Sequence, residues 1–216
     1  LSATNDRDAK QVAELCRTVI AQVALSTEHR PEAWNVFVKE TLSKLSAQLT
    51  DGSSRVPIAY AAVLASRGGS KTLQLCLKTM LPPLLQVVRD GSSIDKQEFV
   101  NTALYGIGAF FSSCRAAMDR AANDGVQWHP HPLQPYCSEA VQVLCGIAND
   151  NAAAIRALES VLLASPPAED DMERINTMLR HMSSRLVVAP EGTEELQAAR
   201  AQTLGVFLGR ALTAES

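Results

Sequence analysis

Residues 71–113 constrain the fold most strongly, because they read as two amphipathic helices joined by a short turn. In the first half Leu77, Leu84 and Val88 recur at helical spacing and form an apolar stripe. Neither helix could bury its apolar face alone. The rest of the chain is therefore expected to supply further helices that stack on this pair.

Local signals set the limits of the two helices. Pro82 and Pro83 lie inside the first one and are expected to bend it, since proline removes a backbone donor. Gly91 is expected to end that helix by adopting the left-handed conformation. Asp95 then serves as the N-cap of the second helix, and Glu98 completes a capping box.

The same kind of unit recurs along the chain. Apolar periodicity and breaks predict helices over 8–25, 32–49, 55–66, 71–89, 96–122, 136–148, 152–164, 169–187 and 193–212. Most loops are short, so neighbouring helices are expected to run antiparallel. Leu42 and Leu45 recur as Leu81 and Leu84, an offset of 39 residues. This period favours an all-α fold, an α-solenoid of the HEAT or armadillo type with about nine helices. A plain globular helical bundle is the alternative.

Composition excludes several function classes. The chain is 46% hydrophobic but only 5% aromatic, which suits packed helices better than a β-sandwich. The net charge of −3, without clustered Lys and Arg, argues against nucleic acid. No apolar run approaches the ~20 residues of a membrane span, and five irregularly spaced cysteines indicate free thiols. We therefore expect residues 1–216 to be a single solenoid fragment of a longer cytoplasmic or nuclear protein.

One irregular insertion, 124–135, interrupts the repeat, because its prolines forbid regular helix. Trp128 and these prolines are expected to fold back over the ends of adjacent helices. The alternative is a loop that contacts a protein partner through Trp128 and His131.

The insertion and the following helix also hold potential metal ligands. The spacing of His129, His131, Cys137 and Cys145 matches no zinc pattern, and both cysteines fall on the apolar side of a helix. We therefore expect no metal site and no cofactor.

The acidic cluster of Glu169, Asp170 and Asp171 opens a predicted helix, where it complements the positive end of the helix dipole. The alternative is a negatively charged ridge for a basic partner.

Two glycines inside another helix, Gly106 and Gly108, indicate the close approach of a neighbouring helix. Neither feature suggests catalysis.

Catalytic motifs are not apparent. The segment 66–72, SRGGSKT, carries Ser70 where a phosphate loop needs glycine before Lys71, so it reads as a helix stop and restart. No Ser, Cys or His lies in a nucleophile elbow or triad context. The sequence thus predicts a non-enzymatic protein whose partners are other proteins, without a small-molecule substrate.

Residues 77–111, which contain Tyr105-Gly106-Ile107-Gly108, resemble a repeat of importin-β-type karyopherins, and 162–182 look like a second feature near the C-terminal end of that family. The resemblance implies a nuclear transport receptor that binds basic cargo along its inner helices and the GTPase Ran elsewhere. The inner helices would be 8–25, 55–67, 96–122 and either 136–148 or 151–164. The same helices are nearly as similar to the HEAT-repeat subunit of the cytosolic iron–sulfur assembly targeting complex.

Overall fold

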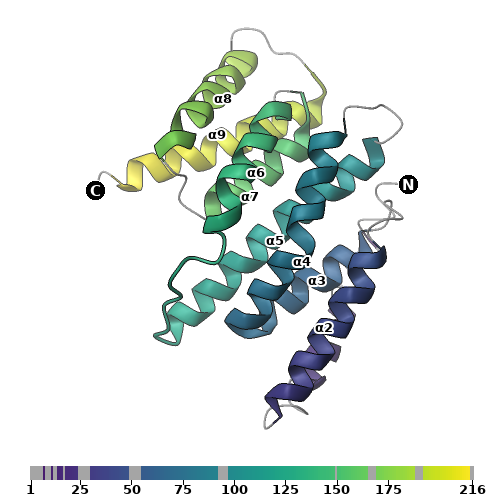
Figure 1. The fold of residues 1–216 in the computed structure, drawn as a ribbon. Helices are drawn as coiled ribbons and strands as arrows, with labels where there is room; N and C mark the ends of the chain where they lie inside the picture. The colour runs from purple at the N-terminus through teal and green to yellow at the C-terminus, as the bar shows by residue number, and fades with distance from the viewer. Residues whose placement is uncertain are drawn as a thin grey trace.

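The computed structural model describes residues 7, 11, 14–16, 18–23, 30–48, 55–91, 97–148, 150–164, 169–187 and 192–214. Within these ranges every regular element is a helix, which confirms the predicted all-α fold (Figure 1). The helices are α2 (Pro31–Gln48), α3 (Val56–Arg67), α4 (Gly69–Asp90), α5 (Gln97–Asn123), α6 (Gln134–Ile147), α7 (Ala152–Ala164), α8 (Glu169–Val187) and α9 (Glu194–Ala214). The described residues within 7–23 are helical too. None of the helices described is long and apolar enough to cross a membrane.

The helices form two layers (Figure 1). Helices α2, α4, α6 and α8 contact one another in turn, and so do α3, α5, α7 and α9. Extensive contacts among the described helices join only elements that are one or two apart in chain order. Such nearest-neighbour packing is typical of stacked helix pairs. Of the two candidates for the fourth inner helix, α7 rather than α6 therefore lies in the layer of α3 and α5.

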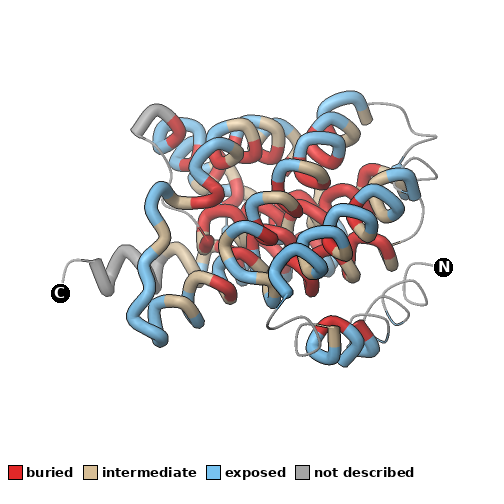
Figure 2. The backbone as a smooth tube through the Cα atoms, turned by 60° about the horizontal axis from the view of Figure 1, so that its bottom comes forward, coloured by how far each residue is buried: buried red, intermediate tan, exposed pale blue. Residues whose placement is uncertain are grey.

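The predicted period agrees with this layering. Leu42 of α2 and Leu81 of α4 are each 1% exposed or less, and their two helices contact each other in one layer. The buried residues continue from α2 to α9 as one apolar core between the layers (Figure 2). Each helix pair thus completes its core against the next, as the sequence pattern requires.

Glycine ends α4 for a reason other than the predicted one. The φ of Gly91 is −78°, so this residue is not left-handed. A Cβ atom at Gly91 would instead lie 2.2 Å from Val100 Cγ2, on the facing helix α5. The expectation of a left-handed stop was wrong at this position, because close packing of α5 excludes a side chain. The proposed cap residue Asp95 lies outside the described residues.

Proline occurs both inside a helix and at the start of one. Helix α4 runs through Pro82 and Pro83, both exposed, without a break in the helix. Pro135 lies in the first turn of α6, which therefore begins two residues before the predicted start at 136. Helices α7 and α8 have the predicted bounds.

Candidate protein-binding groove

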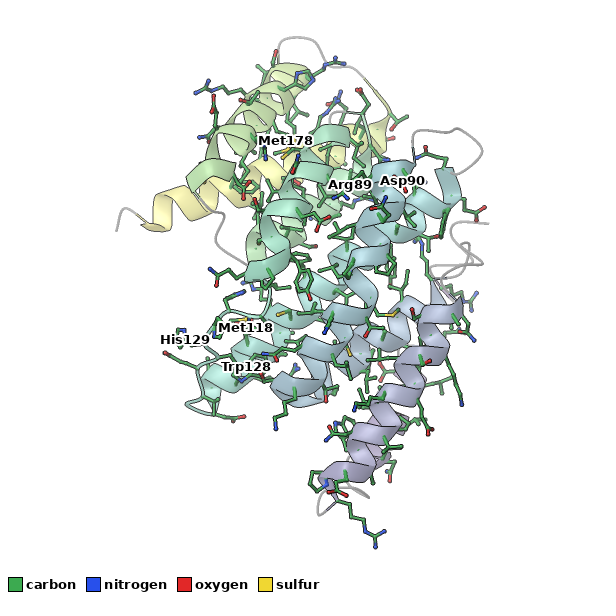
Figure 3. All side chains as sticks on the ribbon, viewed as in Figure 1. Arg89, Asp90, Met118, Trp128, His129 and Met178 are labelled. Carbon is green, nitrogen blue, oxygen red and sulfur yellow. The ribbon has the colours of Figure 1, made fainter. Side chains whose placement is uncertain are left out.

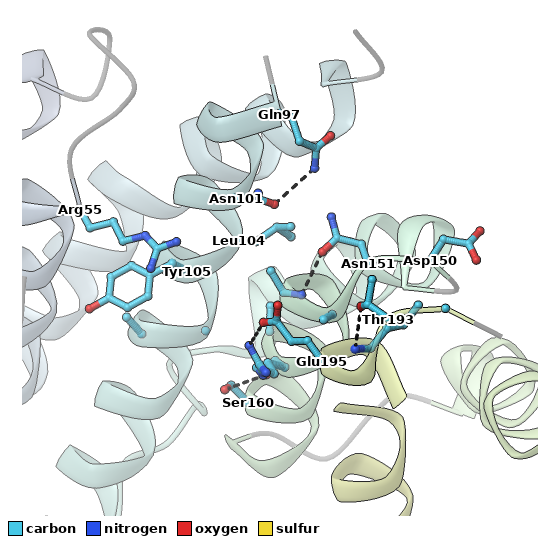
Figure 4. A pocket seen from close by; sticks show the side chains of 18 of the residues that line it. Arg55, Gln97, Asn101, Leu104, Tyr105, Asp150, Asn151, Ser160, Thr193 and Glu195 are labelled. Carbon is cyan, nitrogen blue, oxygen red and sulfur yellow. Dashed lines mark hydrogen bonds and ion pairs between the residues drawn. The ribbon is translucent and has the colours of Figure 1, made fainter. Parts of the chain in front are cut away.

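A groove of about 850 Å³ lies on the layer formed by α3, α5, α7 and α9 (Figure 4). Its lining comes from α5, from α7 and the two residues before it, from the first turn of α9 and the two residues before it, and from Arg55 just before α3. We call it the α5–α7 groove. Because its walls belong to helices far apart in the sequence, the stacking of the pairs creates it.

The α5 wall carries an amide pair followed by an aromatic ring. Gln97 and Asn101 stand one helical turn apart, and Gln97 Nε2 donates a hydrogen bond to Asn101 Oδ1 at 3.3 Å. Tyr105 occupies the next turn, and the Arg55 guanidinium carbon lies 5.0 Å from the centre of its ring. This distance is that of a cation–π contact. The contact holds the Arg55 side chain at one end of the groove (Figure 4).

The opposite wall consists of two helix N-termini. Asn151 caps α7: its Oδ1 accepts hydrogen bonds from the backbone N–H groups of Ala153 at 2.9 Å and Ala154 at 3.1 Å. The Thr193 hydroxyl oxygen accepts one from the N–H of Leu196 at 3.3 Å and so caps α9. Satisfied caps make this wall a defined surface rather than a pair of frayed ends.

An ion pair joins the two helices of that wall. Arg156 of α7 and Glu195 of α9 are 2.8 Å apart, and about half or more of each side chain is exposed. The floor between the walls is lined by small residues, including Gly108 and Ala157. A Cβ atom at Gly108 would stand 3.5 Å from Ala157 Cα, an ordinary contact. Small side chains thus leave the space that forms the groove.

A second groove of about 700 Å³ lies between α3 and α5 and shares Tyr105, Ala109 and Ser112 with the first. Arg120 of its lining donates a hydrogen bond to the backbone carbonyl of Ser66, which links α5 to α3. The two grooves share part of their lining and together involve four helices of one layer, α3, α5, α7 and α9.

Charges of both signs line this surface. The charged residues among the described lining are Arg55, Arg67, Arg120, Arg156, Glu14, Asp150 and Glu195. A row of carboxylates, which would favour a receptor for basic cargo, is not among them.

The predicted loop residues lie at the edge of the structure, away from the groove lining. Trp128 is half-buried and packs against the core beside the C-terminal part of α5, whereas His129 is exposed (Figure 3). His131 Nδ1 accepts a hydrogen bond from the N–H of Leu133 at 3.2 Å. Burial lowers the pKa of His131, and a hydrogen bond with the backbone of Ala164 opposes this effect. Trp128 therefore packs the insertion against the core, as the fold-back interpretation expected. The contact of Trp128 and His131 with a protein partner stays a prediction.

The acidic cluster lies in the first turn of α8, as predicted. Helix α8 begins at Glu169, but the side chains of Glu169 and Asp170 lie outside the described residues. Asp171 is only 1% exposed, and its Oδ1 accepts a hydrogen bond from the Ser138 hydroxyl at 3.1 Å. Helical spacing places Asp171 on the same buried side of α8 as Ile175. It therefore faces α6 and cannot belong to an exposed ridge.

The thiols also face inward. Burial raises the pKa of Cys76 and of Cys114 to about 12, and that of Cys145 to about 11. These thiols are therefore protonated at neutral pH and poor nucleophiles. Cys137 is buried while His129 is exposed, and no group of three potential metal ligands comes together in the part of the chain that the structure describes.

Sequence reasoning missed the groove. Its signal was the pair Gln97 and Asn101 at helical spacing just before Tyr105, polar residues that are exposed and half-buried in a helix with a broad buried side. The facing residues of α7 and α9 could be assigned to the same site only after the stacking order was known. No protein-family model, curated protein or solved structure matches the chain.

Proposed function

We propose that the chain is a non-catalytic scaffold that binds an extended segment of another protein in the α5–α7 groove. The observation that carries this proposal is the polar stripe of Gln97, Asn101 and Tyr105 along one wall of the groove. Side-chain amides both donate and accept hydrogen bonds, as the backbone of an extended peptide does.

The spacing of the stripe suits an extended peptide. Residues four apart on a helix are displaced by about 6 Å along its axis. Two residues of an extended chain span about 6.6 Å. A peptide that lies along α5 could therefore present equivalent backbone groups to Gln97 and Asn101 in succession.

The groove suits binding better than catalysis. Among the lining residues that the structure describes there is no histidine, cysteine or lysine. Ser160 Oγ donates to the Arg156 carbonyl at 3.1 Å, and Glu195 is engaged by Arg156. A general base beside a nucleophile, which acyl or phosphoryl transfer needs, is not assembled by these groups.

The transport-receptor function, with cargo and Ran as partners, remains a prediction from the resemblance, and so does the iron–sulfur adaptor alternative. A stack of helix pairs with a groove along one layer is compatible with both. The mixed charge of the groove lining gives no support for a preference for basic cargo. A pull-down with Ran loaded with GTP would separate the receptor from the adaptor.

Groove-directed peptide selection tests the proposal. Peptides would be selected from a random display library on the wild-type chain, and binding measured by fluorescence anisotropy. Ser112→Trp fills the surface where the grooves meet, and Ser112 is exposed, so the fold should tolerate it. We expect at least tenfold weaker binding to Ser112→Trp and to Asn101→Ala.

The matched control is Ser184→Trp, at an exposed position of α8. It adds the same indole on the other layer and should leave binding unchanged. If no selected peptide distinguishes Ser112→Trp from Ser184→Trp, the groove is not the binding site.

A further inference from the structure

We infer that the α5–α7 groove recognises its peptide through one bulky apolar side chain, which enters between α5 and α7 while the neighbouring backbone lies on the amides of α5. This inference rests on the proposed function, because it names the side chain by which the groove would choose its partner. The occupant is thus an extended protein segment with a leucine, methionine or aromatic residue as its anchor.

The floor of the groove is built from residues with little or no side chain. Helices α5 and α7 come together where a Cβ atom on Gly108 would lie 3.5 Å from Ala157 Cα. The small and apolar lining residues around this contact are Leu104, Gly108, Ala109, Ala152, Ala153 and Ala157. Leu104 and Ala157 are buried, and the three other alanines are half-buried and pack against the core. Side chains that end at Cβ leave space above the core, which a large side chain of a partner can fill.

The polar atoms beside the floor already make hydrogen bonds within the protein. The Ser160 hydroxyl donates to the Arg156 carbonyl, and Asn151 Oδ1 accepts from two N–H groups of α7. A polar anchor would therefore lose its water without gaining a full set of partners, whereas an apolar anchor gains by leaving water.

The charges around the groove do not favour a charged anchor. Two positive and two negative side chains line it, namely Arg55, Arg156, Asp150 and Glu195. The N-terminal ends of α7 and α9 add positive dipole ends, and Asp150 before α7 and Glu195 in the first turn of α9 complement them.

No charged side chain stands on the floor among the described lining residues. Arg156 and Glu195 pair with each other at 2.8 Å, and Arg55 lies over the Tyr105 ring. A charged anchor would thus be desolvated without an opposite charge directed at it. Electrostatic complementarity therefore favours a neutral side chain at this position.

The spacing along α5 places the anchor relative to the amides. Asn101 and Gly108 are seven residues apart, about 10.5 Å along the helix axis. Three residues of an extended chain span about 10 Å. A peptide whose backbone lies on Asn101 would therefore bring a side chain to the floor about three residues further on. The side chains on either side of the anchor point away from the floor, because successive side chains of an extended chain alternate.

Filling the floor tests the inference on peptides that bind the wild type but not Ser112→Trp. We expect these peptides to share one bulky apolar residue, and its replacement by alanine should weaken binding at least tenfold. Ala153→Leu, which occupies the floor from α7, should weaken the original peptides at least tenfold. The same variant should bind the alanine-substituted peptide at least as tightly as the wild type does, because the new leucine replaces the anchor.

The matched control is Ala33→Leu, which adds the same side chain at an exposed position of α2 on the other layer and should leave binding unchanged. Circular dichroism would confirm the fold of each variant. Ala109→Leu fills the floor from α5 and gives the same test if Ala153→Leu does not fold.

The outcomes separate the inference from the proposed function. Groove-dependent peptides that share no apolar anchor, or that bind the filled variants as tightly as the wild type, would overturn the inference and leave the proposed function intact. If no peptide depends on the groove, both the inference and the proposed function are overturned.

Discussion

Gly106 of α5 lies so close to α4 that a Cβ atom there would stand 2.8 Å from Leu84 Cδ1. The same atom would lie 3.2 Å from Ile58 Cδ1 on α3. One glycine therefore sets the approach of three helices at the centre of the stack. The sequence indicated this close approach, because glycine inside a helix needs a compensating reason.

Gly106→Ala should therefore destabilise the protein. Overpacking a core lowers the free energy of unfolding by about 1–3 kcal/mol. The better helix propensity of alanine offsets up to about 1 kcal/mol of this loss. We expect a net loss of roughly 1–2 kcal/mol in the free energy of unfolding, measured by urea denaturation.

The matched control is Gly146→Ala in α6, where a new Cβ atom meets nothing within 4 Å. This variant should be neutral or up to ~1 kcal/mol more stable. Equal effects of the two substitutions would show that helix propensity, and not helix approach, decides the outcome.

The strongly periodic helices could be predicted from the sequence. Helices α7 and α8 have the expected bounds, and the acidic first turn of α8 marked its start. Asp171 lies in the predicted first turn but is buried, so the alternative of an exposed ridge was wrong for this residue. A preference for the first turn says nothing of which side faces a neighbouring helix. The groove could not be found because Asn101 and Asn151 line the same groove only through the stacking of α5 on α7.

Ser138→Ala should lower the free energy of unfolding, because it removes a hydrogen bond to the buried Asp171 carboxylate. Asp171 Oδ2 is buried and makes no hydrogen bond, so Oδ1 carries the bond from Ser138. Arg174, at 3.7 Å from Oδ1, is about half exposed and only partly compensates the charge. Loss of the serine hydroxyl should lower the free energy of unfolding by about 1–2 kcal/mol.

Chemical denaturation at pH 7 measures this loss. Ser183→Ala, at an exposed position of α8, serves as the control and should stay within about 0.5 kcal/mol of the wild type. A Ser138→Ala variant as stable as Ser183→Ala would mean that water replaces the serine hydroxyl.

The buried thiols should make the fold sensitive to alkali. The pKa of Cys76 is about 12 in the fold against 9.0 for a free thiol. Below pH 9 the thiol is neutral in both states, so its contribution to stability is fully present. As pH rises from 9 towards 12, only the unfolded chain loses this proton, and stability falls.

At pH 10 the loss for one such thiol is ~1.4 kcal/mol. Urea denaturation of the wild type and of Cys76→Ala at pH 8 and pH 10, under reducing conditions, would isolate it. The wild type should lose more stability than the variant between the two pH values. A pH dependence that the substitution does not reduce would contradict the assignment.

Nuclear magnetic resonance of the side-chain amides tests the central claim most directly. The side-chain NH₂ signals of Gln97, Asn101 and Asn151, assigned by substitution of each residue, would be followed during titration with a display-selected peptide. We expect these signals to shift together and to saturate with the Kd from anisotropy. Unchanged groove amides, with saturating shifts confined to the layer of α2, α4, α6 and α8, would contradict peptide binding in the α5–α7 groove.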